Sequence, residues 1–251
     1  MRNLLYGLYR RRLRRRVSHL PVPRHVGIIL DGNRRWAAMQ RASAKHGHQA
    51  GAAKVREFLG WCDDLGVEVV TLWLLSTDNL SRDEAEVSQL LRIINETVNE
   101  LAETGSWRIH PMGFWDELPA PIRENLQRIK ESCGTRDGML VNVAVGYGGR
   151  REVVDAVRSL LQEHAGQGTS LEELAATIDI EHIADHLYTK GQPDPDLVIR
   201  TSGEQRLGGF LLWQSQYSEF WFCEAYWPDF REIDFLRAVR SYGGRHRRFG
   251  A

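Results

Sequence analysis

Short runs of β-branched residues alternate with longer amphipathic stretches beyond residue 23, and this alternation limits the possible folds more than any other feature. Residues 25–30 and 140–145 are mostly apolar and have the length of buried strands. Residues 81–103 instead keep apolar side chains at helical spacing for about five turns. Strands that alternate with helices predict a parallel sheet with both faces covered. We therefore expect an α/β fold with a central, mostly parallel sheet of about six strands surrounded by helices.

Turn and capping signals divide the chain into individual elements. Ser81 with Glu84, and Ser170 with Glu173, have the spacing of capping boxes that begin helices. The predicted strands are residues 25–30, 67–75, 107–113, 140–145, 197–200 and 219–224, and the predicted helices are residues 52–65, 81–103, 121–132, 152–163 and 233–242.

The composition is that of an ordinary globular protein, with 42% hydrophobic and 26% charged residues among 251. The longest apolar run, residues 69–75, is far shorter than the roughly 20 residues that span a bilayer, and no secretory signal fits the arginine-rich start. Cys62, Cys133 and Cys223 have no paired spacing, which suits a reducing compartment. We expect a cytoplasmic protein.

The first 22 residues are predicted to form a basic arm. Residues 1–24 contain eight arginines and no acid, which leaves 25 basic against 33 acidic residues in the rest of the chain. Leu5, Leu8 and Val17 lie among these arginines, so a helix here would be amphipathic, as in segments that lie on anionic membranes. A solvated arm is an equal alternative. We expect no nucleic-acid partner, because no aromatic platform or reader motif accompanies the charge.

Four polar loops follow the predicted strands, at the edge where open α/β sheets bind ligands. In the first loop, Asp31 and Gly32 precede Asn33, Arg34 and Arg35 at the start of a helix. A close glycine turn, free helix amides and two guanidiniums describe a phosphate site. Asp31 would repel a phosphate charge ~4 Å away by roughly 4 kcal/mol, and a bridging Mg²⁺ reverses that sign. The alternative is a capping aspartate beside solvated arginines.

The other loops add polar groups to the same edge. Residues 76–82 offer hydroxyls, an amide and a cation, and residues 200–209 offer two arginines and flexible glycines for a second anion. A solvated charged loop is the alternative for residues 200–209. Residues 146–150 are not a dinucleotide loop, because Arg151 stands where the third glycine belongs.

Taken together, these stretches resemble the cis-prenyltransferase family, which comprises undecaprenyl diphosphate synthase and its shorter-chain relatives. The resemblance covers residues 23–250, in the order HVGIILDGNRRWA, GHQAG, TLWLLSTDNLSR, VNVAVGYGGRREVVDAV, PDLVIRTSGEQRLGGFLLWQ, YSEFWF, WPDF and RRFG. It implies a Mg²⁺-dependent homodimer that condenses isopentenyl diphosphate with an allylic diphosphate to form a new Z double bond. Residues 23–251 would then be a single catalytic domain with a hydrophobic tunnel, walled by the predicted helices over residues 52–65 and 81–103.

The resemblance also implies roles for individual residues. Asp31 and Glu219 would bind Mg²⁺, and Asp31 would assist departure of the allylic diphosphate. Asn79 matches a position assigned to deprotonation, although a neutral amide is a poor base and suits orientation of substrate or water better. Arg248 and Gly250 match a terminal signature that reaches the neighbouring subunit. The resemblance implies that the allylic diphosphate is held by Gly32, Asn33, Arg34, Arg35 and His48, with Trp36 bordering the site, and that isopentenyl diphosphate is positioned by Arg200, Arg206 and Gly208. Further residues implied to bind substrate are Ser76, Thr77, Asp78, Arg82 and Leu207.

Leu74 is the residue that points to product length. Long-chain family members have the pattern Tyr-Ala-Phe-Ser where this chain has Trp73, Leu74, Leu75 and Ser76, so a leucine would obstruct the tunnel early. We expect a short product, (2Z,6E)-farnesyl diphosphate made from geranyl diphosphate by one condensation. A medium- or long-chain synthase (decaprenyl or undecaprenyl) is the alternative.

Two other classes are disfavoured by the first loop. A hydrolase of the haloacid-dehalogenase kind needs a second aspartate where Asn33 stands, and a non-catalytic scaffold subunit would have lost the loop that begins at Asp31. Departures from the family pattern bear on the choice of allylic substrate. They are Arg34 for a glycine, Ala44 for an arginine, Asp78 for a glutamate, Leu80 for a tryptophan and Gln205 for a histidine.

Overall fold

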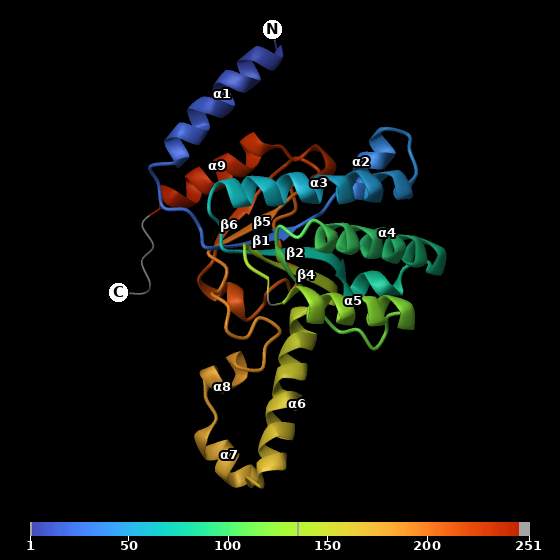
Figure 1. The fold of residues 1–251 in the computed structure, drawn as a ribbon, viewed down its shortest axis with the longest axis vertical. Coiled ribbons are helices and arrows are strands. Elements are labelled where there is room, and N and C mark those ends of the chain that lie inside the picture. Colours follow the sequence, from blue (N-terminus) through green and yellow to red (C-terminus); the bar gives the residue numbers. More distant parts are fainter. Residues whose placement is uncertain (1, 135, 246–251) are drawn as a thin grey trace.

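A six-stranded parallel sheet forms the centre of the computed structural model, which describes residues 2–134 and 136–245 (Figure 1). The strand order is β3-β4-β2-β1-β5-β6, and all five pairs of neighbouring strands are parallel. β1 and β5 are buried along their whole length, as the inner strands of a parallel sheet are. The predicted fold class is confirmed. The strands are β1 (His25–Ile29), β2 (Val69–Ser76), β3 (Arg108–Met112), β4 (Leu140–Tyr147), β5 (Leu197–Arg200) and β6 (Glu219–Phe222).

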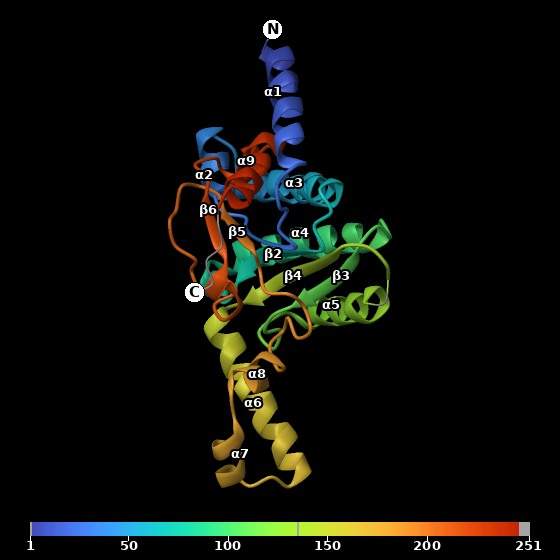
Figure 2. The same cartoon turned by 90° about the vertical axis from the view of Figure 1, so that its left-hand side faces the viewer.

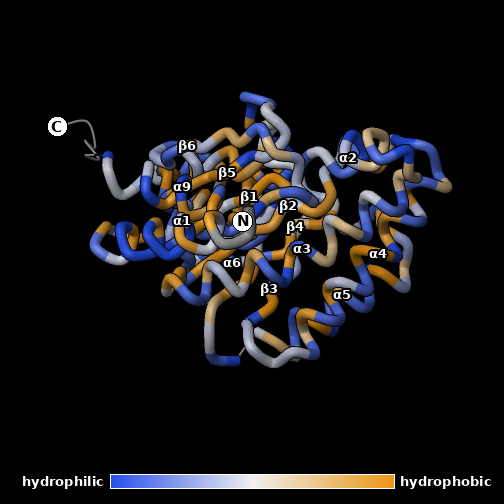
Figure 3. The backbone as a smooth tube through the Cα atoms, turned by 90° about the horizontal axis from the view of Figure 1, so that it is seen from above, coloured by the Kyte–Doolittle hydropathy of each residue, from blue (hydrophilic) through white to orange (hydrophobic). Residues whose placement is uncertain are grey.

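Long helices cover one face of this sheet and form the main hydrophobic core with it. Phe58 lies at the centre of that core, with its ring in edge contact with Trp227 and Phe235. The hydrophobic segments of the strands are enclosed, and hydrophilic segments lie around them (Figure 3). The helices on this face are α1 (Arg2–Val17), α3 (Ala44–Asp64), α4 (Glu84–Glu103), α5 (Ala120–Cys133) and α9 (Glu232–Gly243).

The other face is covered mainly by irregular segments. Phe210 and Leu211 are fully buried there against Ile29, Val198 and Tyr147. α6 begins at the carboxyl end of β4 and runs away from the sheet, and α7 and α8 return beside it (Figures 1 and 2). The remaining helices of the described residues are α2 (Asn33–Met39), α6 (Gly149–Gln167), α7 (Leu171–Thr177), α8 (Ile180–Ala184), η1 (Thr77–Ser81), η2 (Gln214–Tyr217) and η3 (Trp227–Asp229).

The basic arm forms the expected helix, α1, but its second half is docked and not solvated. Leu13 and Val17 are buried in the main core, where α1 packs against α9. Arg14 binds Glu232 and Asp64 at the same contact. Leu5 and Leu8 stay exposed farther out along α1. Among the described residues, no helix has the length and apolar character needed to cross a bilayer.

Three helix starts differ from the predictions by three residues or more, and one of them is that of α6, which begins at Gly149 and not at residue 152. α4 begins at Glu84, not at Ser81, because the Asp83 carboxylate accepts hydrogen bonds from the amides of Ala85 and Glu86, while residues 77–81 form η1. α3 begins at Ala44, not at residue 52, and includes Gly47 and Gly51 in its first turns. The capping box of Ser170 and Glu173 is confirmed.

The central position of Phe58 predicts a large cost for its truncation. Phe58→Ala should lower the free energy of unfolding by about 3–5 kcal/mol, because a ring-sized cavity would open between α3, α9 and η3. Met39→Ala, at a side chain that is 74% exposed, should change it by less than about 0.5 kcal/mol. Denaturant unfolding followed by circular dichroism measures both, and equal effects would contradict the placement of Phe58.

Candidate active site

The first and fourth polar loops face each other across neighbouring strand ends. β1 and β5 are paired with Ile29 opposite Arg200, so both loops leave the sheet at the same edge. Arg200 donates from Nη2 to Oδ2 of Asp31 at 2.8 Å, and the Thr201 hydroxyl donates to the carbonyl oxygen of Asp31 at 2.7 Å. Along the sheet, β1 is followed by β2 on one side and β5 is followed by β6 on the other side. The point between β1 and β5 is therefore a switch point, where open α/β sheets bind ligands.

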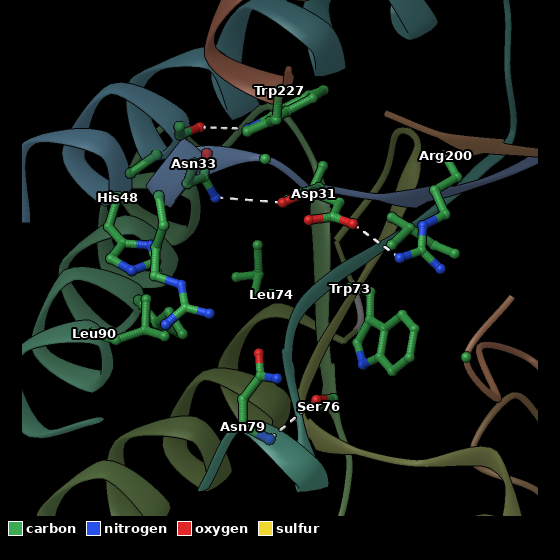
Figure 4. A pocket seen from close by; sticks show the side chains of 18 of the residues that line it. Asp31, Asn33, His48, Trp73, Leu74, Ser76, Asn79, Leu90, Arg200 and Trp227 are labelled. Atoms are coloured by element: carbon green, nitrogen blue, oxygen red, sulfur yellow. Dashed lines mark hydrogen bonds and ion pairs between the residues drawn. The ribbon is translucent and has the colours of Figure 1, made fainter. Parts of the chain in front are cut away.

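A cavity of about 540 Å³ opens at this point (Figure 4). Its size lies within the range of small-molecule sites. α3 and α4 form its apolar wall, as predicted, with residues that include Val55, Leu90 and Ile94. The predicted site residues that line the cavity are Asp31, Gly32, Asn33, Arg34, Arg35, His48, Leu74, Ser76, Asp78, Asn79, Arg82, Arg200, Arg206 and Gly208.

Glycines in α3 bring this helix close to the first loop. A Cβ atom at Gly47 would lie 2.2 Å from the carbonyl oxygen of Asn33, and one at Gly51 would lie 2.3 Å from Oδ1 of Asn33. Both glycines therefore allow α3 to touch the start of α2, and this contact brings His48 to the cavity. The helix contact explains why two residues that usually weaken helices stand in the first turns of α3.

Four predicted site residues lie outside the cavity wall. Trp36 stacks on His46, with ring centroids 5.6 Å apart, and Leu207 packs into the core beside Phe210. Thr77 contacts Gly148 at the start of α6. Within the described chain, these three side chains border the site without lining it.

Glu219 is the fourth, and it lies far along the sheet from Asp31. It is the first residue of β6 and pairs with Leu197, at the amino end of β5, whereas Asp31 follows the carboxyl end of β1. Its carboxylate binds Arg245. One chain therefore does not bring Asp31 and Glu219 to the same site. Arg248 and Gly250 lie outside the described residues.

Carboxylates link the cavity arginines in pairs. Asp31 binds Arg200 and Arg35, the latter at 3.1 Å, and Glu204 binds both Arg35 and Arg206. On the opposite rim, Glu86 binds Arg34 at 3.4 Å and Arg82 at 3.3 Å. The guanidiniums are therefore held at the cavity before any ligand arrives, as an anion site requires.

Sequence reasoning missed several residues of this site. Glu204 stands between two expected ligands, yet its double pairing depends on Arg35 from another loop. Trp73 was noted only as the neighbour of Leu74. Trp227, in the WPDF stretch, lines the cavity and donates from its indole to the carbonyl oxygen of Gly51 at 2.7 Å.

Burial and charge act in opposite directions on Asp31. Burial alone raises its pKa, but hydrogen bonds from Arg200 and Ser202, and the charges of Arg200 and Arg35, hold the pKa below its usual range. The carboxylate is therefore ionised at neutral pH. Burial lowers the pKa of His48; the charges of Arg82 and Arg34 lower it further, while Glu86 opposes them.

The donor set fits a magnesium ion that shares its ligands with a phosphate. Mg²⁺ is usually bound through one or two carboxylates together with substrate phosphates and water. Asp31 supplies one carboxylate, and the buried Oδ1 atom of Asn33 beside it has no partner in the described chain. No group of three or more His, Cys, Asp or Glu residues among those described could enclose a metal ion. The residues fit a metal that arrives with its phosphate ligand.

Comparison with known proteins agrees with this geometry. Residues 29–250 match a family model described as "Putative undecaprenyl diphosphate synthase". The chain is 61% identical over 247 residues to (2Z,6E)-farnesyl diphosphate synthase of Thermobifida fusca, an alignment that covers 98% of this chain and 97% of that one. It is 50% identical over 250 residues to the short-chain Z-isoprenyl diphosphate synthase of Mycobacterium bovis, and this alignment covers 98% of this chain and 95% of that one.

A solved structure extends the agreement to the fold. Lavandulyl diphosphate synthase from Lavandula x intermedia, crystallised with dimethylallyl diphosphate, superposes with a TM-score of 0.84 at 34% identity. The superposition covers 92% of this chain and 99% of that one.

The surroundings of His48 predict an unusual titration. Its pKa should lie below the ordinary value of about 6.5, so the imidazole stays neutral at a pH where a free histidine is half protonated. Glu86→Gln should lower this pKa further, because the charge of Glu86 favours the imidazolium. Imidazole chemical shifts followed by NMR against pH measure it, with Glu103→Gln at the far end of α4 as the control. A rise of the pKa in Glu86→Gln would contradict the assignment.

Proposed function

The chain belongs to the undecaprenyl diphosphate synthase family of cis-prenyltransferases, and from this premise we propose that it makes (2Z,6E)-farnesyl diphosphate from geranyl diphosphate and isopentenyl diphosphate. The observation that carries the short product is the position of Leu74. Its side chain extends from the end of β2 toward Leu90 on α4, across the apolar part of the cavity (Figure 4). The names of the relatives at 61% and 50% identity support the same product class.

The reaction exchanges one carbon–oxygen bond for one carbon–carbon bond. The bond between carbon 1 of geranyl diphosphate and its diphosphate breaks, and carbon 4 of isopentenyl diphosphate bonds to carbon 1. A proton then leaves carbon 2 of the isopentenyl unit, which gives the Z double bond and free diphosphate. The cavity suits this chemistry because it joins two arginine clusters to one apolar wall.

The first loop would hold the group that leaves. Arg35 and Asn33 lie at the start of α2, where helix amides and a guanidinium favour an anion, and the neutral His48 can donate a hydrogen bond. Asp31 would share Mg²⁺ with that diphosphate. When bound, Mg²⁺ neutralises charge that develops on the departing diphosphate.

The fourth loop would hold the acceptor. Arg200 is almost fully buried and Arg206 lies at the rim, so one anchors the isopentenyl diphosphate and the other closes over it. Asn79 lines the cavity between β2 and α4, where its amide can orient substrate or water. A neutral amide does not serve as the base for the proton of carbon 2.

The proposal includes a homodimer in the cytoplasm. Support for the dimer comes from apolar side chains that a single chain leaves exposed, namely Val154 and Leu161 on α6, Ile180 on α8 and Phe222 on the edge strand β6. The family signature at Arg248 and Gly250 would reach the partner's site. Peripheral contact with an anionic membrane is supported by Leu5 and Leu8, which are 63% and 55% exposed among the arginines of α1.

Product analysis tests the reaction. The purified chain, supplied with Mg²⁺ and isopentenyl diphosphate, should convert geranyl diphosphate into a fifteen-carbon product with one new Z bond, in preference to dimethylallyl or farnesyl diphosphate. EDTA should stop turnover, and Asp31→Ala should lower kcat by about a hundredfold or more, because the carboxylate acts on the leaving group. Products of about fifty carbons from the unmodified chain would contradict the short-chain assignment.

Truncation of Leu74 tests the length limit. Leu74→Ala should shift the main product by at least one further five-carbon unit, because each unit that finds room gains roughly 4 kcal/mol at ~0.8 kcal/mol per buried methylene. Leu171→Ala, at an exposed side chain outside the cavity, should leave product length unchanged. Chromatographic sizing of dephosphorylated products measures both, and an unchanged product from Leu74→Ala would remove Leu74 as the limit.

A further inference from the structure

Residues from both faces of the sheet line the cavity at the end of β2, and we refer to the parts on the two faces as its two lobes. Trp73 and Leu74 are consecutive in this strand and both line the cavity. The register against β4 shifts between Trp73 and Leu75, so the face of each side chain follows from its packing partners and not from simple alternation. Leu74 packs with the main core on the helix-covered face, whereas Trp73 packs with Ile29 and Phe210 on the other face. Figure 4 shows Leu74 directed toward Leu90 and Trp73 beneath Arg200. One lobe is therefore the apolar tunnel, and the other belongs to the arginine loop.

Trp73 is part of the lobe that contains Arg200. In the sheet register, Ile29 pairs with Trp73 on one side and with Arg200 on the other, so all three side chains share one face. A Cβ atom at Gly208 would lie 3.5 Å from Cη2 of Trp73 and 3.9 Å from Nη1 of Arg200. Gly208, at a φ of 62°, thus leaves space at the point where the indole meets the guanidinium.

Neighbouring residues fix the indole in one orientation. The Phe210 ring stacks on it, with centroids 5.2 Å apart and an interplanar angle of 11°. The indole nitrogen donates to the carbonyl oxygen of Tyr147 at 3.3 Å, and the Tyr147 ring meets it edge-on. Trp73 therefore lines the cavity with the surface that these contacts leave free, which includes the edge near Gly208.

We propose that Trp73 forms the hydrocarbon wall of the acceptor lobe and is a substrate-contacting positioning residue. Its free indole surface would pack against the five carbons of isopentenyl diphosphate while Arg200 and Arg206 hold the diphosphate. The contact sets where carbon 4 lies relative to the first loop. Because Phe210 and Ile29 are buried behind the ring, the lobe ends there and accepts a short chain only. This inference rests on the proposed function for the identity of the acceptor.

A pair of probes isolates the hydrocarbon contact. Isopentenyl diphosphate and methyl diphosphate share a head group but differ in the carbons that Trp73 would touch. Their affinities are measured by titration calorimetry in the presence of Mg²⁺. The allylic site is first filled with geranyl thiolodiphosphate, in which a carbon–sulfur bond replaces the carbon–oxygen bond that would break, so no reaction follows. Trp73→Leu should weaken isopentenyl diphosphate about tenfold and change methyl diphosphate by less than about twofold. Trp73→Phe, which keeps an aromatic ring, should recover most of the lost affinity.

Controls separate this contact from a general effect on the fold. Trp115→Leu changes a half-buried tryptophan at the groove beside α5, outside the cavity, and should leave both affinities unchanged. In steady-state kinetics, Trp73→Leu should raise KM for isopentenyl diphosphate and lower kcat, with KM for geranyl diphosphate within about twofold. Equal weakening of both probes, or weakening of neither, would overturn the inference. If Trp73→Leu does not fold, Trp73→Met, which also removes the aromatic ring, decides by the same ratio of probe affinities.

The outcomes also distinguish this inference from the proposed function. If the unmodified chain makes the fifteen-carbon product but the ratio of the two probe affinities is the same in Trp73→Leu as in the unmodified chain, the role of Trp73 is contradicted and the proposed reaction is not. If the ratio of probe affinities changes as expected but the unmodified chain makes no such product, the proposed reaction is contradicted and the role of Trp73 is not.

Discussion

The ion pair between Asp31 and Arg200 is the contact on which the rest of the site depends. It joins the ends of two neighbouring parallel strands, so its geometry is set by the sheet and not by flexible loops. The backbone repeats the connection, because Asp31 donates its amide to the Thr201 hydroxyl at 2.9 Å and accepts the amide of Trp227 at its carbonyl oxygen. Both arginine clusters are therefore held in fixed relation before a substrate binds, and this removes ordering cost from the reaction.

The cavity is lined from both faces of the sheet, and the side chains on the two faces differ in character. Apolar residues of α3 and α4 face the helix-covered side, where a hydrocarbon tail gains from leaving water. The other side has Arg200 and the fixed ring of Trp73. Because Leu74 and Trp73 pack against different hydrophobic clusters, a substitution at Leu74 need not disturb the surroundings of Trp73.

Local patterns predicted the strands and the loops at their ends because buried parallel strands and helix starts have strong sequence signals. Three features of tertiary origin were not predictable in this way. Gly47 and Gly51 are helical because α3 must touch Asn33, and Leu13 is buried because α9 lies beside it. The Glu204 pairing joins two loops that are distant in sequence. The resemblance assigned Glu219 a role with Asp31, but strand direction sets the two apart within one chain.

The paired arginines explain how a strongly basic cavity persists without its ligand. A buried guanidinium such as that of Arg200 is costly unless a carboxylate and further acceptors satisfy it. Asp31 and the carbonyl oxygen of Arg206 accept from its two terminal nitrogens, whereas its buried Nε has no partner in the described chain. Asp31 can serve because its lowered pKa keeps it ionised. When a diphosphate enters, a guanidinium exchanges its carboxylate partner for a phosphate. Among the described residues, the cavity therefore presents no unpaired cation before the diphosphate binds. Since Arg35 is paired with both Asp31 and Glu204, a diphosphate that displaces Glu204 frees Arg206, while Arg35 and Arg200 stay paired with Asp31.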